Sequence, residues 1–239
     1  MRRASFASGL ISGLANFLYP SACPSCRNPS DSLVLAPFCA NCWQGLTRYR
    51  GPSCRICGVP LVSPHANCCR NCLEHPPFFA RAASFGLYDA LLASAIHHFK
   101  FLGIRRLSEP LAELLWFHDT ADIDAIVPVP LSADALRERG FNQALLLAYR
   151  LSKRKSLPLA MDSLRKVINT PPQVGLSAKE RAANVRKAFT CAGGVSGLNI
   201  LLIDDVMTTG ATVNACTEQL LNSGARHVYV LTLARAGVL

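Results

Sequence analysis

The chain has 239 residues, a hydrophobic content of 50% and a formal net charge of +10 at pH 7. This composition excludes a disordered chain and suits a globular protein with one α/β domain and a small appended module. Beyond the N-terminus, no run approaches the roughly 20 apolar residues of a membrane-spanning helix. The sequence therefore predicts a cytoplasmic protein with no membrane span.

Residues 1–22 start with two arginines before an apolar stretch, which are features of a weak secretory or twin-arginine leader. However, Phe6, Leu10, Leu14 and Phe17 repeat at helical spacing with polar and small residues between them. This pattern is amphipathic and lacks an unbroken apolar core. We therefore expect an N-terminal amphipathic helix over residues 1–22.

Nine of the eleven cysteines lie between Cys23 and Cys72, largely as CxxC pairs, a pattern that indicates metal binding in a reducing compartment. A CxxC turn aims two sulfurs at one point, and the following loop brings back the second pair. Residues 23–77 are therefore predicted to form a double zinc ribbon with two structural Zn2+ sites. The expected ligands are Cys23, Cys26, Cys39 and Cys42 in one site, and Cys54, Cys57, Cys69 and Cys72 in the other.

Several alternatives remain open for this module. The cysteines could be reduced and metal-free, or they could serve an iron-sulfur or redox role. Cys68 could replace Cys69 or be a spare thiol, and pairing across the two sets is also compatible with the spacing. We expect His65 and His75 at the surface and Gly58 in a tight knuckle turn.

After a Pro-rich boundary at residues 74–79, apolar strands and helices alternate, which is typical of a parallel sheet covered on both faces. We expect this second domain to span residues 78–239. The predicted strands cover residues 81–89, 124–130, 200–204 and 227–234. The predicted helices cover residues 90–101, 106–117, 140–155, 177–185 and 211–222.

The strand at 200–204 runs into two adjacent acids and then into a hydroxyl-rich turn around Gly210. A Walker phosphate loop would require a lysine that is missing here, and an aspartyl-phosphate enzyme would require an acid where Val206 stands. Two carboxylates can instead accept hydrogen bonds from a ribose diol, while hydroxyls and N–H groups at a helix N-terminus hold a 5′-phosphate. We therefore predict a sugar-phosphate site formed by Asp204, Asp205, Val206, Met207, Thr208, Thr209, Gly210, Ala211 and Thr212.

Residues 200–212 resemble the signature of type I phosphoribosyltransferases, which bind 5-phosphoribosyl 1-pyrophosphate (PRPP). The double CxxC ribbon, "IHHFKF", "VPVPLS", "RERGFNQ" and "PPQVGLSAKERAANVRKAF" follow in an order that resembles the ComF family, with its ComFC-like and GntX-like members. The resemblance covers nearly the whole chain. It implies an α/β fold, with a type I phosphoribosyltransferase-like parallel sheet domain after an N-terminal Cys-rich zinc-ribbon module.

The resemblance also implies a function and further site residues. Members of the family are phosphoribosyltransferase-like, so we expect binding of PRPP or a related ribose 5-phosphate ligand with Mg2+, phosphoribosyl transfer to an unidentified acceptor, and a role in DNA uptake. The resemblance places eight residues in or around the pyrophosphate loop of the family: Val129, Pro130, Leu131, Arg137, Arg139, Asn142, Gln143 and Lys100. Matched to the mobile hood are Arg165, Gln173, Arg181 and Asn184.

Residues 137–187 favour an alternative function, because they hold twelve Lys/Arg against three acids, a net charge of +9. Such a strip can follow a phosphate backbone. The alternative is a non-catalytic module that handles single-stranded DNA in the transformation machinery and docks a DNA-uptake helicase or translocation protein. Individual members, such as Lys153, Arg154 and Lys155, are equally compatible with a solvated helix face.

Overall fold

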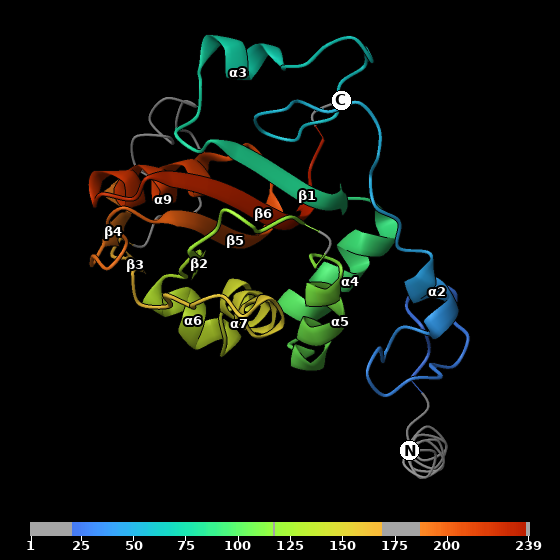
Figure 1. The fold of residues 1–239 in the computed structure, drawn as a ribbon. Coiled ribbons are helices and arrows are strands. Elements are labelled where there is room, and N and C mark those ends of the chain that lie inside the picture. Colours follow the sequence, from blue (N-terminus) through green and yellow to red (C-terminus); the bar gives the residue numbers. More distant parts are fainter. Residues whose placement is uncertain (1–20, 117, 169–186, 238–239) are drawn as a thin grey trace.

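The structure is a computed structural model that describes residues 21–116, 118–168 and 187–237. Its centre is a parallel sheet in the strand order β1-β6-β5-β2 (Figure 1). The strands are β1 (Arg81–Leu87), β2 (Ala125–Pro128), β5 (Asn199–Met207) and β6 (His227–Arg235). The predicted α/β class with a parallel sheet is confirmed.

Helices cover both faces of this sheet (Figure 1). On one face lie α4 (Ala90–Lys100), α5 (Ser108–Glu113) and α7 (Gln143–Lys155), and on the other lies α9 (Ala211–Asn222). Successive strand residues point to opposite faces, so β5 contributes Leu201 and Ile203 to the α4/α7 core and Ile200 and Leu202 to the α9 core. In the described part of the chain, no helix is both long and apolar enough to span a membrane.

Three of the predicted boundaries were wrong. Gly140 does not open a helix but ends one, because it adopts a left-handed φ of 75° as the C-cap of α6 (Ala133–Arg139), a helix that was not predicted. The predicted helix over 106–117 is instead a short 3-10 turn, η1 (Arg105–Leu107), followed by α5. Strand β5 continues past Asp204 to Met207, because these residues still pair with β6.

Two further strands were not expected. They are β3 (Leu164–Lys166) and β4 (Phe189–Cys191), which form a separate antiparallel sheet. Each has only three residues, too few for a recognisable alternating pattern. The predicted helix over 177–185 and most of the one over 1–22 lie outside the described residues.

The cysteine-rich segment contributes to the cores on both faces of the sheet. Its first half includes α2 (Ala40–Gln44), which lies beside α4 and α5 (Figure 1), and it places Phe38 in the core of that face. Its second half includes α3 (Arg70–Glu74) and places Val59 in the core of the α9 face. The ribbons are therefore part of the hydrophobic packing of the sheet.

Strand β1 lies at one edge of the sheet, and the cysteine-rich segment hydrogen-bonds to it. The N–H of Tyr49 donates to Phe85 O at 3.0 Å, and the N–H of Ala82 donates to Ile56 O at 2.6 Å. These bonds pair backbone groups that an edge strand otherwise leaves open.

Strand β2 lies at the opposite edge, where the segment after α7 runs alongside it. The N–H of Ile126 donates to Pro158 O at 2.8 Å, and the N–H of Ala160 donates to Ile126 O at 2.9 Å. Both edges of the sheet are thus paired with irregular backbone.

Candidate functional site

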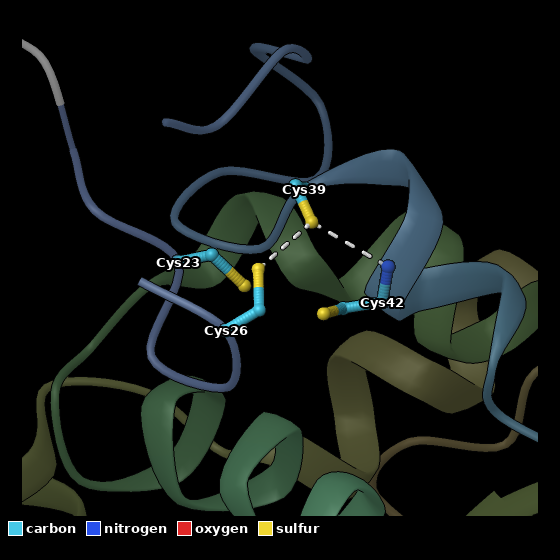
Figure 2. A group of neighbouring side chains, drawn as sticks. All are labelled: Cys23, Cys26, Cys39 and Cys42. Atoms are coloured by element: carbon cyan, nitrogen blue, oxygen red, sulfur yellow. Dashed lines mark hydrogen bonds between the residues drawn. The ribbon is translucent and has the colours of Figure 1, made fainter. Parts of the chain in front are cut away.

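The first cysteine foursome converges on one point (Figure 2). The sulfurs of Cys23, Cys26, Cys39 and Cys42 all lie within 4.8 Å of one another, and the Cys26 and Cys39 sulfurs are 3.6 Å apart. A tetrahedral Zn2+ with bonds of about 2.3 Å separates its sulfurs by about 3.8 Å. The arrangement therefore fits a closed structural zinc site.

The second foursome has the same geometry. The sulfurs of Cys54, Cys57, Cys69 and Cys72 also lie within 4.8 Å of one another, and the Cys57 and Cys69 sulfurs are 3.7 Å apart. Pairing across the two sets does not occur. Cys68 lies outside this foursome with its sulfur 3.8 Å from that of Cys54, so it is a neighbouring spare thiol.

The backbone of the second site prepares Cys54 as a ligand. Burial raises the pKa of its thiol, but hydrogen bonds from the backbone of Cys57, Cys69 and Ile56 outweigh burial and lower the pKa to about 6. Gly58 allows this turn, because its φ is +69° and a Cβ there would lie 3.1 Å from Ala82 O.

We expect protein purified without chelator to carry two zinc ions per chain, because both foursomes are complete. Elemental analysis of the purified protein measures this ratio. A value near one would mean that one foursome does not hold metal, and iron in place of zinc would contradict the structural assignment.

A second candidate site lies at the carboxyl end of the sheet, where ligands bind in parallel α/β proteins. Strand β2 ends at Pro128 while β5 continues, so the side of Asp205 that faces β2 has no strand beside it. There Asp204 Oδ1 accepts a hydrogen bond from the N–H of Asp205 at 2.8 Å. The pairing of β2 with β5 therefore ends two residues before Asp205.

The two carboxylates have different surroundings, because adjacent strand residues point to opposite faces. On the α4/α7 side, Asp205 is 2% exposed and its Oδ2 lies 2.6 Å from Lys100 Nζ. On the other side, burial raises the pKa of Asp204 well above its usual range, and the charge of Asp205 raises it further. One acid is thus ion-paired and the other is held toward its protonated form.

A chain of polar contacts leads from Asp205 to the surface. The amide of Gln143 donates from Nε2 to Asp205 Oδ1 at 3.5 Å, and Gln143 Oε1 accepts from Arg139 Nη1 at 2.7 Å. Lys100 and Arg139 both lie over the ring of Phe101, at 5.6 Å and 5.2 Å from its centroid. Four predicted residues, Lys100, Arg139, Gln143 and Asp205, are therefore brought together with two positive charges.

The predicted pyrophosphate loop also lies next to the acids. The N–H of Val129 donates to Ile203 O at 2.9 Å, and Val129 O accepts from Asn142 Nδ2 at 3.0 Å. Asn142 is in addition the N-cap of α7, since its Oδ1 accepts from the N–H of Leu145 at 3.3 Å. Pro130 and Leu131 follow in the same loop. The loop is thus fixed between β5 and α7.

The turn after β5 forms the start of α9. Gly210 is its N-cap, with a φ of 84° and no side-chain cap, and a Cβ at this position would lie 2.8 Å from Met207 Cε. The side chains of Thr208, Thr209 and Thr212 are exposed around it. Exposed hydroxyls at an uncapped helix N-terminus can hold an anion.

The structure does not bring every predicted residue to this site. Arg137 is exposed and ion-paired with Asp134 in its own helix α6. Arg165 is exposed on β3, and among the described residues it forms no hydrogen bond or ion pair with the acids. Gln173, Arg181 and Asn184 lie outside the described residues.

One buried residue at this site was missed by the sequence analysis. Arg235, at the end of β6, is 5% exposed and donates to the carbonyl oxygens of Met207, Thr208 and Ala236. A single arginine at the end of the last strand carries no sequence pattern. Its role depends on residues that lie far away in the chain.

A separate cavity of about 580 Å³ lies at the opposite, amino end of the strands. Its lining includes Arg48, Arg55, Arg81 and His118, together with the acids Asp119 and Asp122. Burial, together with the charges of Arg48, Arg81 and Lys155, lowers the pKa of His118 to about 4. Basic side chains from four separate segments therefore gather around this histidine.

Comparison with known proteins gives consistent matches. The double zinc ribbon domain family matches residues 14–73. Competence protein F of Haemophilus influenzae is 34% identical over 210 residues, which cover 83% of this chain and 90% of that protein. The DNA utilization protein YhgH of Salmonella typhimurium is 34% identical over 226 residues, which cover 90% of this chain and 97% of that protein.

Among solved structures, glutamine PRPP amidotransferase from B. subtilis matches with 19% identity and a TM-score of 0.38. The match covers 52% of this chain and 25% of that one. A similarity of this size carries no conclusion about the site.

Proposed function

Because the chain belongs to the ComF family, we propose that its second candidate site binds PRPP, or a related ribose 5-phosphate, and transfers the phosphoribosyl group. The observation that carries this proposal is the pair Asp204 and Asp205 directly before the uncapped, threonine-rich start of α9. Carboxylates suit ribose hydroxyls, and a helix N-terminus suits the 5′-phosphate. The relatives' names further favour a role in DNA uptake or use.

In this proposal each part of the ligand meets a different element. The exposed hydroxyls of Thr208, Thr209 and Thr212 surround the 5′-phosphate, and Asp204 and Asp205 accept from the ribose hydroxyls. The pyrophosphate lies toward the loop that starts at residue 129, with Arg139 and Lys100 nearby. The ammonium of Lys100 already occupies the position of a cation beside Asp205. These acids are thus poorly suited to hold Mg2+ themselves, and the metal would arrive bound to the pyrophosphate oxygens.

The proposed reaction breaks the bond between C1′ and the pyrophosphate oxygen and forms a bond from C1′ to an acceptor nitrogen. The electron pair of the broken bond leaves with the pyrophosphate, and the acceptor loses its proton to solvent. Mg2+, when bound with the ligand, would supply charge neutralisation of this leaving group. The positive charges of Lys100 and Arg139 stabilise the same developing charge from the protein side.

Two measurements test this proposal separately. Calorimetric titration of the zinc-loaded protein with PRPP and Mg2+ tests binding, and release of labelled pyrophosphate tests turnover with candidate acceptors. Binding without release would restrict the function to ligand recognition. Absence of binding would refute the proposed site.

A second function, the handling of single-stranded DNA, is favoured by the basic cavity at the amino end of the strands. Its arginines come from the segment between the ribbons, from the second ribbon and from β1, and Lys155 of α7 lies close by, its Nζ 3.1 Å from His118 O. A cluster of this kind can follow a phosphate backbone. The two functions use opposite ends of the sheet, so they are compatible.

If this cavity binds single-stranded DNA, replacing Arg48, Arg81 and Lys155 together by Ala should flatten the salt dependence of binding. Each phosphate contact contributes a slope of about −0.7 in a plot of log K against log salt concentration, so loss of three contacts should change the slope by about 2. Fluorescence anisotropy with a labelled oligonucleotide measures it. Replacing Arg27, Arg70 and Arg226 by Ala is the matched control, because these exposed residues lie outside the cavity lining and outside residues 137–187. Equal slopes in all three proteins would exclude the cavity as the DNA site.

A further inference from the structure

The guanidinium of Arg235 links the second cysteine foursome to the turn that starts the predicted phosphate site. Its Nε donates at 3.1 Å to the carbonyl oxygen of Cys57, which is itself one of the four predicted metal ligands. Its Nη1 donates to Met207 O at 3.0 Å and also to Thr208 O. One rigid, buried side chain therefore joins the metal knuckle to the residues where β5 ends and the threonine-rich turn begins.

A second, independent contact joins the same two regions. The N–H of Phe78, just after the second ribbon, donates to Asn214 Oδ1 at 2.7 Å. Asn214 belongs to the first turn of α9, and its own N–H donates to Gly210 O at 2.9 Å. The ribbon thus holds the turn from both sides, at its start through Arg235 and at its end through Asn214.

The first foursome has no such connection among the described residues. It packs on the other face of the sheet, where Phe38 meets the ring of His98 at 5.3 Å between centroids. The first ribbon also accepts a hydrogen bond from an arginine, since Arg106 Nε donates to Ala36 O at 2.9 Å. Arg106 lies in η1, after α4, and not in the turn before α9. The chain therefore offers an internal comparison between a metal site linked to the turn and one that is not.

We propose that metal at the second foursome sets the ligand affinity of the Thr208–Thr212 turn, with Arg235 as the positioning residue between them. The inference rests on the proposed function for the identity of the ligand. A closed zinc site fixes the position of its ligand residues and their carbonyls. The planar guanidinium of Arg235 donates to one of these carbonyls and to two carbonyls of the turn, so it holds the turn in a fixed position relative to the metal site. When the metal leaves, the carbonyl of Cys57 is no longer held in position. The guanidinium of Arg235 is then fixed only by its bonds on the side of the turn.

Coupling between two binding sites is reciprocal. If zinc at the second foursome strengthens ligand binding, the bound ligand must raise the affinity for that zinc by the same factor. Couplings between protein sites typically change affinity by roughly 5- to 150-fold. We therefore expect saturating PRPP with Mg2+ to lower the equilibrium fraction of zinc that a competing chelator removes from the second foursome, equivalent to about a tenfold gain in zinc affinity, and to leave the first foursome unchanged.

The experiment uses the full chain with both zinc ions bound. A zinc-selective dye follows release, and cysteine alkylation with mass spectrometry identifies which foursome has opened. Selective protection of Cys54, Cys57, Cys69 and Cys72 supports the proposal. Equal protection of both foursomes, or of neither in a protein that binds PRPP, overturns it.

The variant Arg235→Lys tests the positioning residue, because lysine keeps the charge but cannot bridge carbonyls as a planar fork. We expect it to retain both zinc ions, to weaken PRPP binding about tenfold and to lose most of the selective protection. Arg106→Lys is the matched control, since it alters the corresponding arginine contact of the first ribbon. Unchanged PRPP affinity and protection in Arg235→Lys would contradict the assignment.

A readout without ligand separates this inference from the proposed function. Amide hydrogen exchange in residues 207–214 should be about tenfold faster in Arg235→Lys than in the parent or in Arg106→Lys, at equal zinc content. If the parent does not bind PRPP but exchange rises in this way, the proposed ligand is wrong and the coupling stands. If exchange in residues 207–214 is unchanged, the coupling is wrong whatever the ligand.

Discussion

Replacing Asp204 and Asp205 together by Asn should weaken PRPP binding by at least about 100-fold. Asp204 is held toward its protonated form in the free protein, and the proposal requires both acids to be ionised when ribose hydroxyls donate to them. Asn keeps the shape of each side chain but cannot carry that charge, and a hydrogen bond to a charged group contributes roughly 1.5 to 3 kcal/mol. Two such losses exceed the 2.8 kcal/mol or so that corresponds to 100-fold. Calorimetric titration with Mg2+ present measures the difference.

The matched control removes two negative charges elsewhere. Glu113→Gln with Asp124→Asn changes the net charge equally, in α5 and beside the start of β2, and PRPP affinity should stay within about twofold of the parent. If the Asp204/Asp205 variant binds PRPP as the parent does, the acids do not contact the ligand. The site would then need another explanation.

The two single variants should differ in stability, because the acids have different surroundings. Folding raises the pKa of Asp204. The contribution of Asp204 to the free energy of unfolding is therefore greatest below about pH 4, the pKa of the unfolded chain, and it declines as the pH rises toward the pKa of Asp204 in the folded protein. Asp204→Asn removes this decline and should raise the melting temperature at neutral pH but not at pH 4. Asp205→Asn should lower it, because Lys100 loses its ion-pair partner.

Loss of the second zinc site should have the largest effect on stability. Structural zinc contributes an apparent binding free energy of about 10–16 kcal/mol in small zinc-binding peptides, and a whole domain is stable by only about 5–15 kcal/mol. Cys72 is 3% exposed and belongs to the core on the α9 face. We expect Cys72→Ser to retain one zinc ion and to melt at least roughly 10 °C lower, which corresponds to about 3–5 kcal/mol in a chain of this size.

Cys68→Ser is the control for this experiment. Its sulfur lies beside that of Cys54 but outside the foursome, so the variant should keep two zinc ions and the melting temperature of the parent. If Cys68→Ser loses a zinc ion and Cys69→Ser does not, the ligand assignment must be exchanged between these neighbours.

Local patterns in the sequence were sufficient for the metal sites, the sheet and most of the helices around it. The CxxC spacing predicted both foursomes, although only the structure excluded pairing across the two sets and the use of Cys68. Long apolar runs identify strands such as β5. Helix α6 was missed because it has only seven residues and its final glycine was read as the start of the next helix. Strands β3 and β4 were missed because three residues cannot show a period.

The site was predicted least well where contacts depend on distant parts of the chain. Lys100 was predicted only from the family resemblance, yet it forms the ion pair with Asp205, because α4 places it there from 105 positions away in the sequence. Arg137 lies in a favourable motif, but its place on α6 directs it to Asp134. Arg235 lies 178 positions from Cys57, whose carbonyl it contacts, a relation that only the completed fold creates.

The paired edges of the sheet limit how other proteins can bind to this one. At β1 the ribbons supply the backbone partners, and at β2 residues 158–160 do so. Many recognition modules capture a peptide by adding it as an extra strand, which requires an edge with unpaired N–H and C=O groups. In the described part of the chain neither edge offers a free run of this kind. A protein that docks here must therefore be selected by side chains and loops, and the surface that it recognises can diverge between relatives without any change in the sheet.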